Sequence, residues 1–166
     1  MEDRKELVQS AQAGSSQAFA KLYEEIYMDL YHYTLYMLQN RQDAEDAVSE
    51  AVLAAFAGIH KLRNVDAFRG WMFQITTNIC RKKRKEYLKR HVELEENSVE
   101  WVDSTQEALD VRKALKLLSE EERLIVGMSV LAGYTSEEIG RNLHLRPGTV
   151  RSKLSRSLAK MRRILS

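Results

Sequence analysis

The chain has 166 residues, with 26 Lys and Arg against 24 Asp and Glu, so its net charge is only +2; it is rich in helix-forming residues and has one proline. No apolar run is long enough to cross a membrane, and the polar N-terminal residues lack a signal-peptide pattern. The lone cysteine, Cys80, cannot form an internal disulfide, and no Cys/His cluster has zinc spacing. We therefore expect no membrane insertion, a cytoplasmic location, no metal and no cofactor.

Charge alternates in four blocks along the chain. Residues 1–60 carry 10 acids and 4 bases, residues 61–90 carry 2 acids and 10 bases, residues 91–138 carry 12 acids and 4 bases, and residues 139–166 carry 8 bases and no acid. Two separate positive blocks indicate two surfaces that could each bind phosphate. The acidic blocks indicate either spacer segments or surfaces for a basic protein partner.

Four helices are predicted in the N-terminal half. The first covers residues 3–13 and ends at Gly14. The second is capped by Ser15 or Ser16 and has apolar residues at three- and four-residue steps until Asn40 ends it.

The third and fourth helices carry most of the charge in this half. The third begins at Asp43, with acids crowded into its first turn, where the helix dipole stabilises them. Residues 58–65 are predicted to form a loop, and Asp66 can cap the fourth helix. The inward residues of the fourth helix are expected to be Phe68, Met72, Ile75 and Ile79.

The fourth helix combines aromatic side chains with a dense basic run. Phe68, Trp71 and Phe73 precede Asn78 and the basic residues at 81–85. Unstacked nucleobases of a single strand are bound by aromatic surfaces and amide groups, and Lys and Arg side chains neutralise the phosphates. In the alternative interpretation the aromatic residues belong to the core and the basic residues form a solvated face. We expect the apolar residues to be core, and Asn78 and the basic run to contact nucleic acid.

A linker is predicted at residues 91–106, which are acidic and have no sustained helical period. Helices are expected again at about 107–118, 120–132, 135–143 and 147–165. The sequence thus predicts an all-α fold with two small helical domains, 1–90 and 107–166, joined by an acidic linker.

The last two predicted helices have the pattern of a helix-turn-helix. Thr135 and Glu138 form a capping box at the start of the first helix, and Pro147 suits the first turn of the second. The second helix has a basic surface and an apolar stripe made of Val150, Leu154, Leu158, Met161 and Leu165. A short helix, a tight turn and a basic amphipathic helix indicate duplex DNA recognition. The alternative is a purely structural helical hairpin.

Five segments together resemble a bacterial sigma factor of the extracytoplasmic-function (ECF) group. They match the family in order and spacing and are residues 43–46 followed by Glu50, 68–75 with Asn78, 118–123, 134–140 and 147–154. The chain departs from the family at Ser49 and Val52, where Gln and an aromatic residue are common, and at Phe56, where Trp is frequent.

The resemblance implies an all-α, dissociable specificity subunit of RNA polymerase that contributes no catalytic residue. The implied contacts with the core polymerase are Asp43, Glu45, Asp46 and Glu50. The implied contacts with the melted −10 element are Lys61, Arg63, Asn64, Trp71, Asn78, Arg81, Lys82, Arg84 and Lys85. The −35 duplex would be read by Arg146, Thr149, Arg151, Ser152, Lys153, Ser155 and Arg156.

The same resemblance implies core RNA polymerase, promoter DNA and an anti-sigma factor as partners. The acidic linker would run toward the active-site and RNA-exit channels of the polymerase. The main alternative is a helix-turn-helix regulator that acts without polymerase. An enzyme is disfavoured because the sequence offers no nucleophile–base set, paired carboxylates or metal cluster, and the two basic blocks disfavour a pure interaction module.

Overall fold

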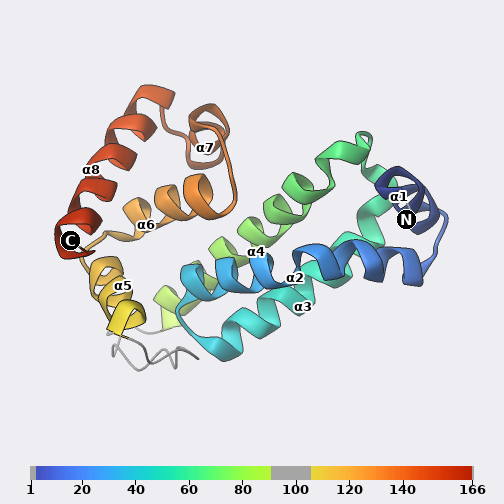
Figure 1. The fold of residues 1–166 in the computed structure, drawn as a ribbon, viewed down its shortest axis with the longest axis horizontal. Coiled ribbons are helices and arrows are strands. Elements are labelled where there is room, and N and C mark those ends of the chain that lie inside the picture. The colour runs from blue at the N-terminus through green and yellow to red at the C-terminus, as the bar shows by residue number, and fades with distance from the viewer. Residues whose placement is uncertain (1–2, 91–105, 166) are drawn as a thin grey trace. The chain divides into compact units, whose positions relative to one another are not determined.

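The structure is a computed structural model that describes residues 3–90 and 106–165, and these form α-helices and short 3₁₀ or π turns without any strand (Figure 1). The chain divides into two compact units, Met1–Val99 and Glu100–Ser166. The predicted all-α, two-domain fold is therefore confirmed. The predicted linker lies outside the described residues, apart from Gln106, which begins α5.

The first two helices begin at side-chain caps. α1 (Arg4–Gln12) is capped by Asp3, whose carboxylate accepts from the Lys5 amide at 3.3 Å. α2 (Ser16–Leu38) is capped by Ser15, whose hydroxyl accepts from the Ala18 amide at 3.2 Å. Of the two serines that the sequence offered, Ser15 is the cap.

The junction between α2 and α3 (Arg41–Gly58) differs from the prediction. Gln39, in the left-handed region at φ 53°, ends α2. Asn40 instead starts α3, because its side chain accepts from the Asp43 amide at 2.9 Å. Asp43 therefore lies in the first turn of α3 rather than at its start. The buried residues of α3 are small: Ala44, Ala47, Val48, Ala51 and Ala55.

The predicted loop at 58–65 contains the short 3₁₀ turn η1 (Ile59–Lys61), and a second one, η2 (Val65–Ala67), follows. Gln12 of α1 fixes this segment by donating to the carbonyls of Ile59 and Leu62 at 3.1 and 2.8 Å. Asp66, which was expected to cap the fourth helix, lies inside η2. The cap of η2 is Asn64, whose side chain accepts from the amide of Asp66 at 3.0 Å.

α4 (Phe68–Arg90) turns a different face inward than the sequence predicted. Phe68 and Met72 are buried as expected, whereas Ile75 and Ile79 are only half-buried. Their places in the core are taken by Phe73, Thr76, Thr77 and Cys80.

The two threonines of α4 tolerate burial because their hydroxyls are hydrogen-bonded. Thr76 donates to the Met72 carbonyl and Thr77 to the Phe73 carbonyl, both at 2.7 Å. The hydroxyls of Thr77 and Tyr33 are also 2.7 Å apart. A buried hydroxyl with a hydrogen-bond partner avoids most of the cost of burial.

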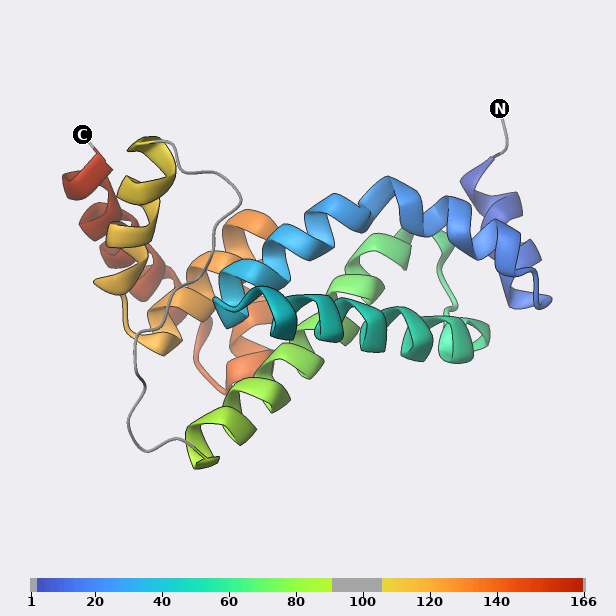
Figure 2. The same ribbon diagram turned by 90° about the horizontal axis from the view of Figure 1, so that it is seen from below.

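In the first unit, α2, α3 and α4 pack side by side and α1 packs on α2 near one end (Figures 1 and 2). Three aromatic rings from three helices join this core. The Phe19 ring of α2 meets Phe56 of α3 at 5.3 Å and Phe68 of α4 at 6.3 Å, both edge-on. This packing holds the acidic surface of α3 and the basic surface of α4 on one rigid support.

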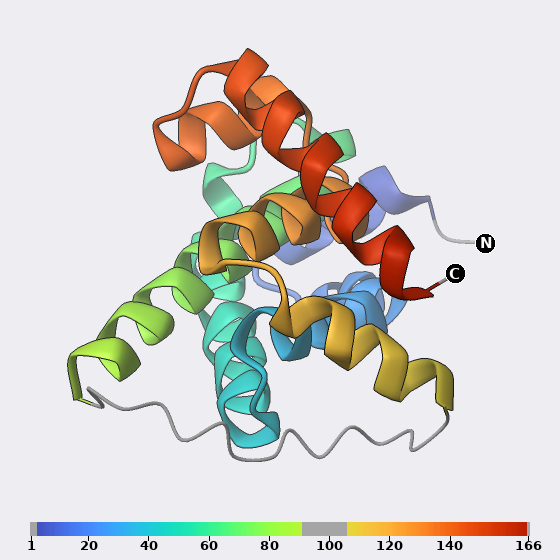
Figure 3. The same cartoon turned by 90° about the vertical axis from the view of Figure 1, so that its left-hand side faces the viewer.

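The second unit contains α5 (Gln106–Lys116), α6 (Glu120–Val126), the π turn η3 (Gly127–Leu131), α7 (Ser136–Leu143) and α8 (Pro147–Leu165). α8 packs against α5, α6 and α7, as Figure 3 shows. The predicted helix at 120–132 thus ends in a π turn. The core is formed by Leu115, Ile125, Met128, Ile139 and Val150, among others.

The helix-turn-helix is present, with one difference at its first cap. Thr135 accepts from the Glu138 amide at 3.1 Å, as predicted. The Glu138 carboxylate, however, accepts from the Thr135 hydroxyl at 3.2 Å, and not from a backbone amide as in a capping box. His144, in the left-handed region at φ 57°, ends α7, and Pro147 begins α8 as expected.

The apolar stripe predicted on α8 is only partly buried. Val150 is in the core, Leu154, Leu158 and Met161 are half-buried, and Leu165 is 47% exposed. The fully buried polar residue is Ser157, which the sequence pattern did not reveal. None of the described helices has the length and hydropathy of a membrane span.

Candidate polymerase and DNA interfaces

The first surface is the acidic face of α3. Asp43, Asp46 and Glu50 follow one another at three- and four-residue steps, so they lie on one side of the helix. Asp43 is half-buried, and the other two are exposed. Glu45 lies beside this row and accepts from Arg41 at 3.2 Å, while Asp46 accepts from Gln42 at 3.1 Å. All four predicted residues therefore reach the surface of one helix.

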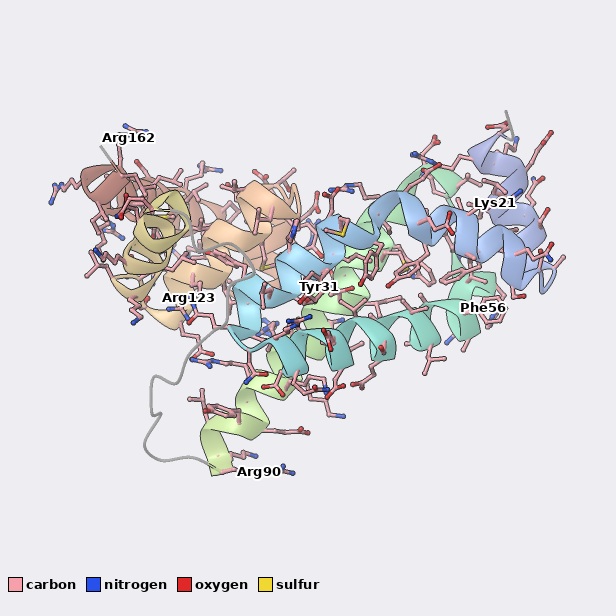
Figure 4. The ribbon with its side chains drawn as sticks, turned by 60° about the horizontal axis from the view of Figure 1, so that its bottom comes forward. Lys21, Tyr31, Phe56, Arg90, Arg123 and Arg162 are labelled. Atoms are coloured by element: carbon pink, nitrogen blue, oxygen red, sulfur yellow. The ribbon has the colours of Figure 1, made fainter. Side chains whose placement is uncertain are left out.

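The second surface is the basic half of α4, which ends at Arg90 (Figure 4). Lys82 and Lys85 are exposed, whereas Arg81 and Arg84 are half-buried. Asn78 is exposed one turn before this run, and its side-chain oxygen accepts from Gln74 at 3.1 Å. The amide pair of Gln74 and Asn78 was not predicted, although its four-residue spacing could have indicated it.

Two further residues of α4 connect its surface to the rest of the first unit. Trp71 is half-buried, with its ring 6.2 Å from that of Phe68. A Cβ added at Gly58, the last residue of α3, would lie 3.9 Å from the indole. Trp71 therefore has a packing role as well as an exposed portion. The second residue, Lys83, forms an ion pair with Glu50 of α3 at 3.3 Å.

The segment between α3 and α4 presents the remaining predicted −10 contacts. Lys61, Arg63 and Asn64 are all exposed. The Asn64 side-chain oxygen already caps η2, which leaves its amide N–H groups for a ligand. The two bonds from Gln12 of α1 hold the segment in place.

The third surface is the outer side of the first turns of α8. Most of the predicted −35 residues are exposed there, and Thr149 is half-buried; the exposed ones are Arg146, Arg151, Ser152, Ser155 and Arg156. Lys153 lies on another side of the helix, where it is half-buried and forms an ion pair with Glu121 of α6. The predicted set is thus split between two sides of α8.

The start of α6 fixes the inner side of α8. The Ser157 hydroxyl lies 3.1 Å from Glu122 and 2.7 Å from the Lys153 carbonyl and shares its one proton between them, and Lys160 donates to Glu122 at 3.0 Å. Burial raises the pKa of Glu122, but hydrogen bonds from Lys160, Ser157 and Ser119 outweigh it and lower that pKa to about 2. Glu122 is therefore a charged anchor for α8.

No metal centre accompanies these surfaces in the part of the chain that the structure describes, where no three His, Cys, Asp or Glu residues form a ligand group.

Two regions of the chain match known families. Residues 22–91 match sigma-70 region 2, and residues 108–161 match sigma-70 region 4. The ECF RNA polymerase sigma factor SigM of Mycobacterium tuberculosis is 28% identical over 163 residues, which cover 96% of this chain and 83% of SigM. SigW of Bacillus subtilis, another ECF sigma factor, is 24% identical over 180 residues, covering 97% and 96%.

Two solved structures share the fold. CnrH, in complex with the cytosolic domain of CnrY, has a TM-score of 0.64 at 22% identity, covering 98% of this chain and 96% of CnrH. RpoE from Bartonella quintana, in complex with the anti-sigma factor NepR, has a TM-score of 0.66 at 21% identity, covering 87% and 96%.

The helical fold with regions 2 and 4 in this order defines the class of sigma-70 transcription initiation factors. Within this class, the chain belongs to the ECF group of RNA polymerase sigma factors.

Proposed function

We propose that this sigma factor divides promoter recognition among three surfaces. The acidic face of α3 binds core polymerase, the basic half of α4 with the 59–67 segment binds the melted −10 strand, and the outer side of α8 reads the −35 duplex. The observation that carries the proposal is the separation of exposed charge: acids gather on α3, and bases gather on α4 and on the outer side of α8. The chain supplies no catalytic residue, and it acts where the polymerase acts, in the cytoplasm.

The −35 assignment is supported by the way α8 is held. Its inner side is fixed to α6 by Lys153, Ser157 and Lys160. The opposite side therefore has a defined orientation, which hydrogen bonding to base edges requires. Arg151 and Arg156 can form paired bonds with guanine, and Ser152 and Ser155 can bond base edges or phosphate.

The −10 assignment is supported by three kinds of group on one helix. Asn78 offers an amide to a base edge, Trp71 offers part of an aromatic surface, and Lys82 and Lys85 offer exposed charge to phosphate. Extruding a base costs a few kcal/mol, and contacts with these side chains would recover part of that cost. Phe73 belongs to the core and is not part of this site.

The polymerase assignment rests on the acidic row of α3, which would meet a basic surface of the core enzyme. Attraction between opposite charged patches speeds association and fixes register more than it adds affinity.

We also infer that an anti-sigma factor binds this chain. RpoE of B. quintana is seen with an anti-sigma factor, NepR, and CnrH is seen with CnrY. The support for this partner comes from these two relatives of the fold.

In vitro transcription with core polymerase on a genomic promoter library tests the proposal, together with a pull-down of core enzyme. Specific transcripts and stable core binding are expected. A helix-turn-helix regulator that acts without polymerase would bind duplex DNA alone, retain no core enzyme and give no transcripts.

A further inference from the structure

Glu137 contacts a proposed DNA-reading residue across the turn of the helix-turn-helix. Its carboxylate, in the first turn of α7, lies 3.5 Å from a terminal guanidinium nitrogen (Nη1) of Arg151 in α8. The side chains are 59% and 60% exposed, respectively. No acidic residue follows Glu138 in the sequence. A carboxylate thus lies at the edge of a surface that must approach polyanionic DNA.

The neighbouring acid has a different task. Glu138 is half-buried and accepts from the Thr135 hydroxyl at 3.2 Å, as part of the cap of α7. Glu137 has no such role in the cap, since Thr135 bonds the Glu138 amide and carboxylate. An exposed ion pair also contributes little to folding stability. The effect of Glu137 is therefore expected in DNA recognition.

The position of the guanidinium indicates what this effect is. The second terminal nitrogen, Nη2, would lie 3.9 Å from a Cβ added at Gly148, so the group lies along the first turn of α8. Arginine has five N–H donors in a rigid planar fork. With Nη1 directed to Glu137, the edge formed by Nε and Nη2 can still make the two parallel bonds that guanine accepts.

We propose that Glu137 is a positioning residue that sets the sequence selectivity of −35 recognition through Arg151. It fixes the fork so that one edge faces a base, and it disfavours a complex in which Arg151 turns to a phosphate. In that complex the carboxylate would remain unpaired beside the DNA backbone. Such a penalty on the wrong complex raises discrimination without adding affinity. The inference rests on the proposed role of Arg151.

A mutant cycle on intact holoenzyme tests this role. The parent, Glu137→Gln, Arg151→Ala and the double variant are each bound to core polymerase. Each complex then competes for a set of promoters that carry every single substitution in the −35 element. Two further variants are controls. Glu137→Asp keeps the negative charge at this position, and Glu120→Gln removes one negative charge at another helix start, that of α6. Relative preferences between promoters do not depend on the fraction of active protein.

Arg151→Ala should abolish the preference at one base pair. Glu137→Gln should lower that same preference by roughly three- to tenfold, which is ~0.7–1.4 kcal/mol, and leave the other positions unchanged. It should have no further effect in the Arg151→Ala background. Glu137→Asp should keep part of the preference, and Glu120→Gln all of it.

Three results would overturn the inference. If Glu137→Gln raised affinity equally for every sequence in both backgrounds, the carboxylate would act only by repelling phosphate. If it changed preference at a base pair that Arg151 does not read, Glu137 would contact a base itself. If Arg151→Ala changed no preference, the proposed base-reading role of Arg151 would fail, and the inference about Glu137 would fail with it. The first two results would overturn only the inference about Glu137 and would leave the proposed role of Arg151 intact.

Discussion

At the scale of single residues, the basic side chains of α8 fall into two groups. Arg151 and Arg156 are exposed on the outer side, whereas Lys153 and Lys160 are held by carboxylates of α6. The two lysines must give up their partners on α6 to bind DNA, whereas Arg151 keeps a donor edge available beside its own partner, Glu137. The two groups should therefore respond differently to substitution.

The first prediction concerns Arg156, with Lys153 as the matched control. Arg156→Ala should cost ~1–3 kcal/mol of binding to the preferred −35 duplex and relax specificity at one position. Lys153→Ala should change the base preference at no position, because its ammonium group bonds Glu121. Competition binding of holoenzyme to −35 variants measures both. An equal loss for Arg156→Ala on all sequences would make it a phosphate contact instead.

The second prediction concerns Glu122, whose pKa is about 2 in the folded protein against an ordinary 4.5. A carboxyl group with a lowered pKa adds stability above its unfolded pKa, and this stability is lost as the pH falls through the folded value. Glu122→Gln should therefore destabilise the second unit at neutral pH by ~1.5–3 kcal/mol, the usual range for a hydrogen bond to a charged group.

Hydrogen exchange of the α8 amides measures this effect in the intact chain. The difference between the parent and Glu122→Gln should shrink as the pH falls from about 4.5 toward about 2. The same substitution at the exposed Glu137 is the control and should change exchange little. A difference for Glu122→Gln that stayed constant over this range would contradict the role of its charge.

At the scale of elements, α3 and α4 present opposite charges from one rigid support. An ion pair between Glu50 and Lys83 joins the two charged surfaces. Single exposed charges contribute only ~0–1 kcal/mol, so the acidic row of α3 must be tested by more than one reversal.

The third prediction is that Asp46→Lys with Glu50→Lys weakens binding to core polymerase while the chain stays helical. The physical reason is repulsion between like-charged patches at the docking surface. A pull-down titration, with circular dichroism for the fold, measures the change. Reversal of Glu6 and Glu24, exposed acids of α1 and α2, provides the same change in net charge. Equal core binding by the α3 double variant and the parent would refute the assignment of this helix.

Much of each element could be predicted from its sequence, because apolar spacing and caps are local signals. The helix-turn-helix at Thr135 and Pro147 was predicted in this way. The errors arise where a side chain has two possible roles. Asn40 could end one helix or cap the next. Asp66, expected to cap the fourth helix, instead lies within η2, which Asn64 caps.

Burial of hydroxyl groups was missed for a similar reason. Thr76, Thr77 and Ser157 are fully buried because each hydroxyl donates to a carbonyl four residues earlier in its own helix. Hydropathy alone places such residues outside. The inward position of Lys153 likewise depends on a carboxylate distant in sequence, Glu121, so the pattern of α8 alone could not separate it from the exposed bases.

At the scale of the whole molecule, the alternating charge blocks correspond to separate surfaces. The block at 61–90 supplies the bases of α4, and the block at 139–166 supplies those of α8. The two blocks belong to different units of the chain. Each unit can therefore be altered without the other, and duplex binding can be separated from promoter opening by experiment.

Permanganate footprinting of the −10 bubble in the holoenzyme tests this division most directly. It compares the parent with Asn78→Ala, with Lys82→Ala/Lys85→Ala and with Arg156→Ala. The two α4 variants should still bind the −35 duplex but melt the −10 element poorly, and the lysine variant should depend more weakly on salt. Arg156→Ala should bind less promoter, yet open what it binds. Normal melting and normal −10 preference in both α4 variants, with the fold intact, would contradict the account.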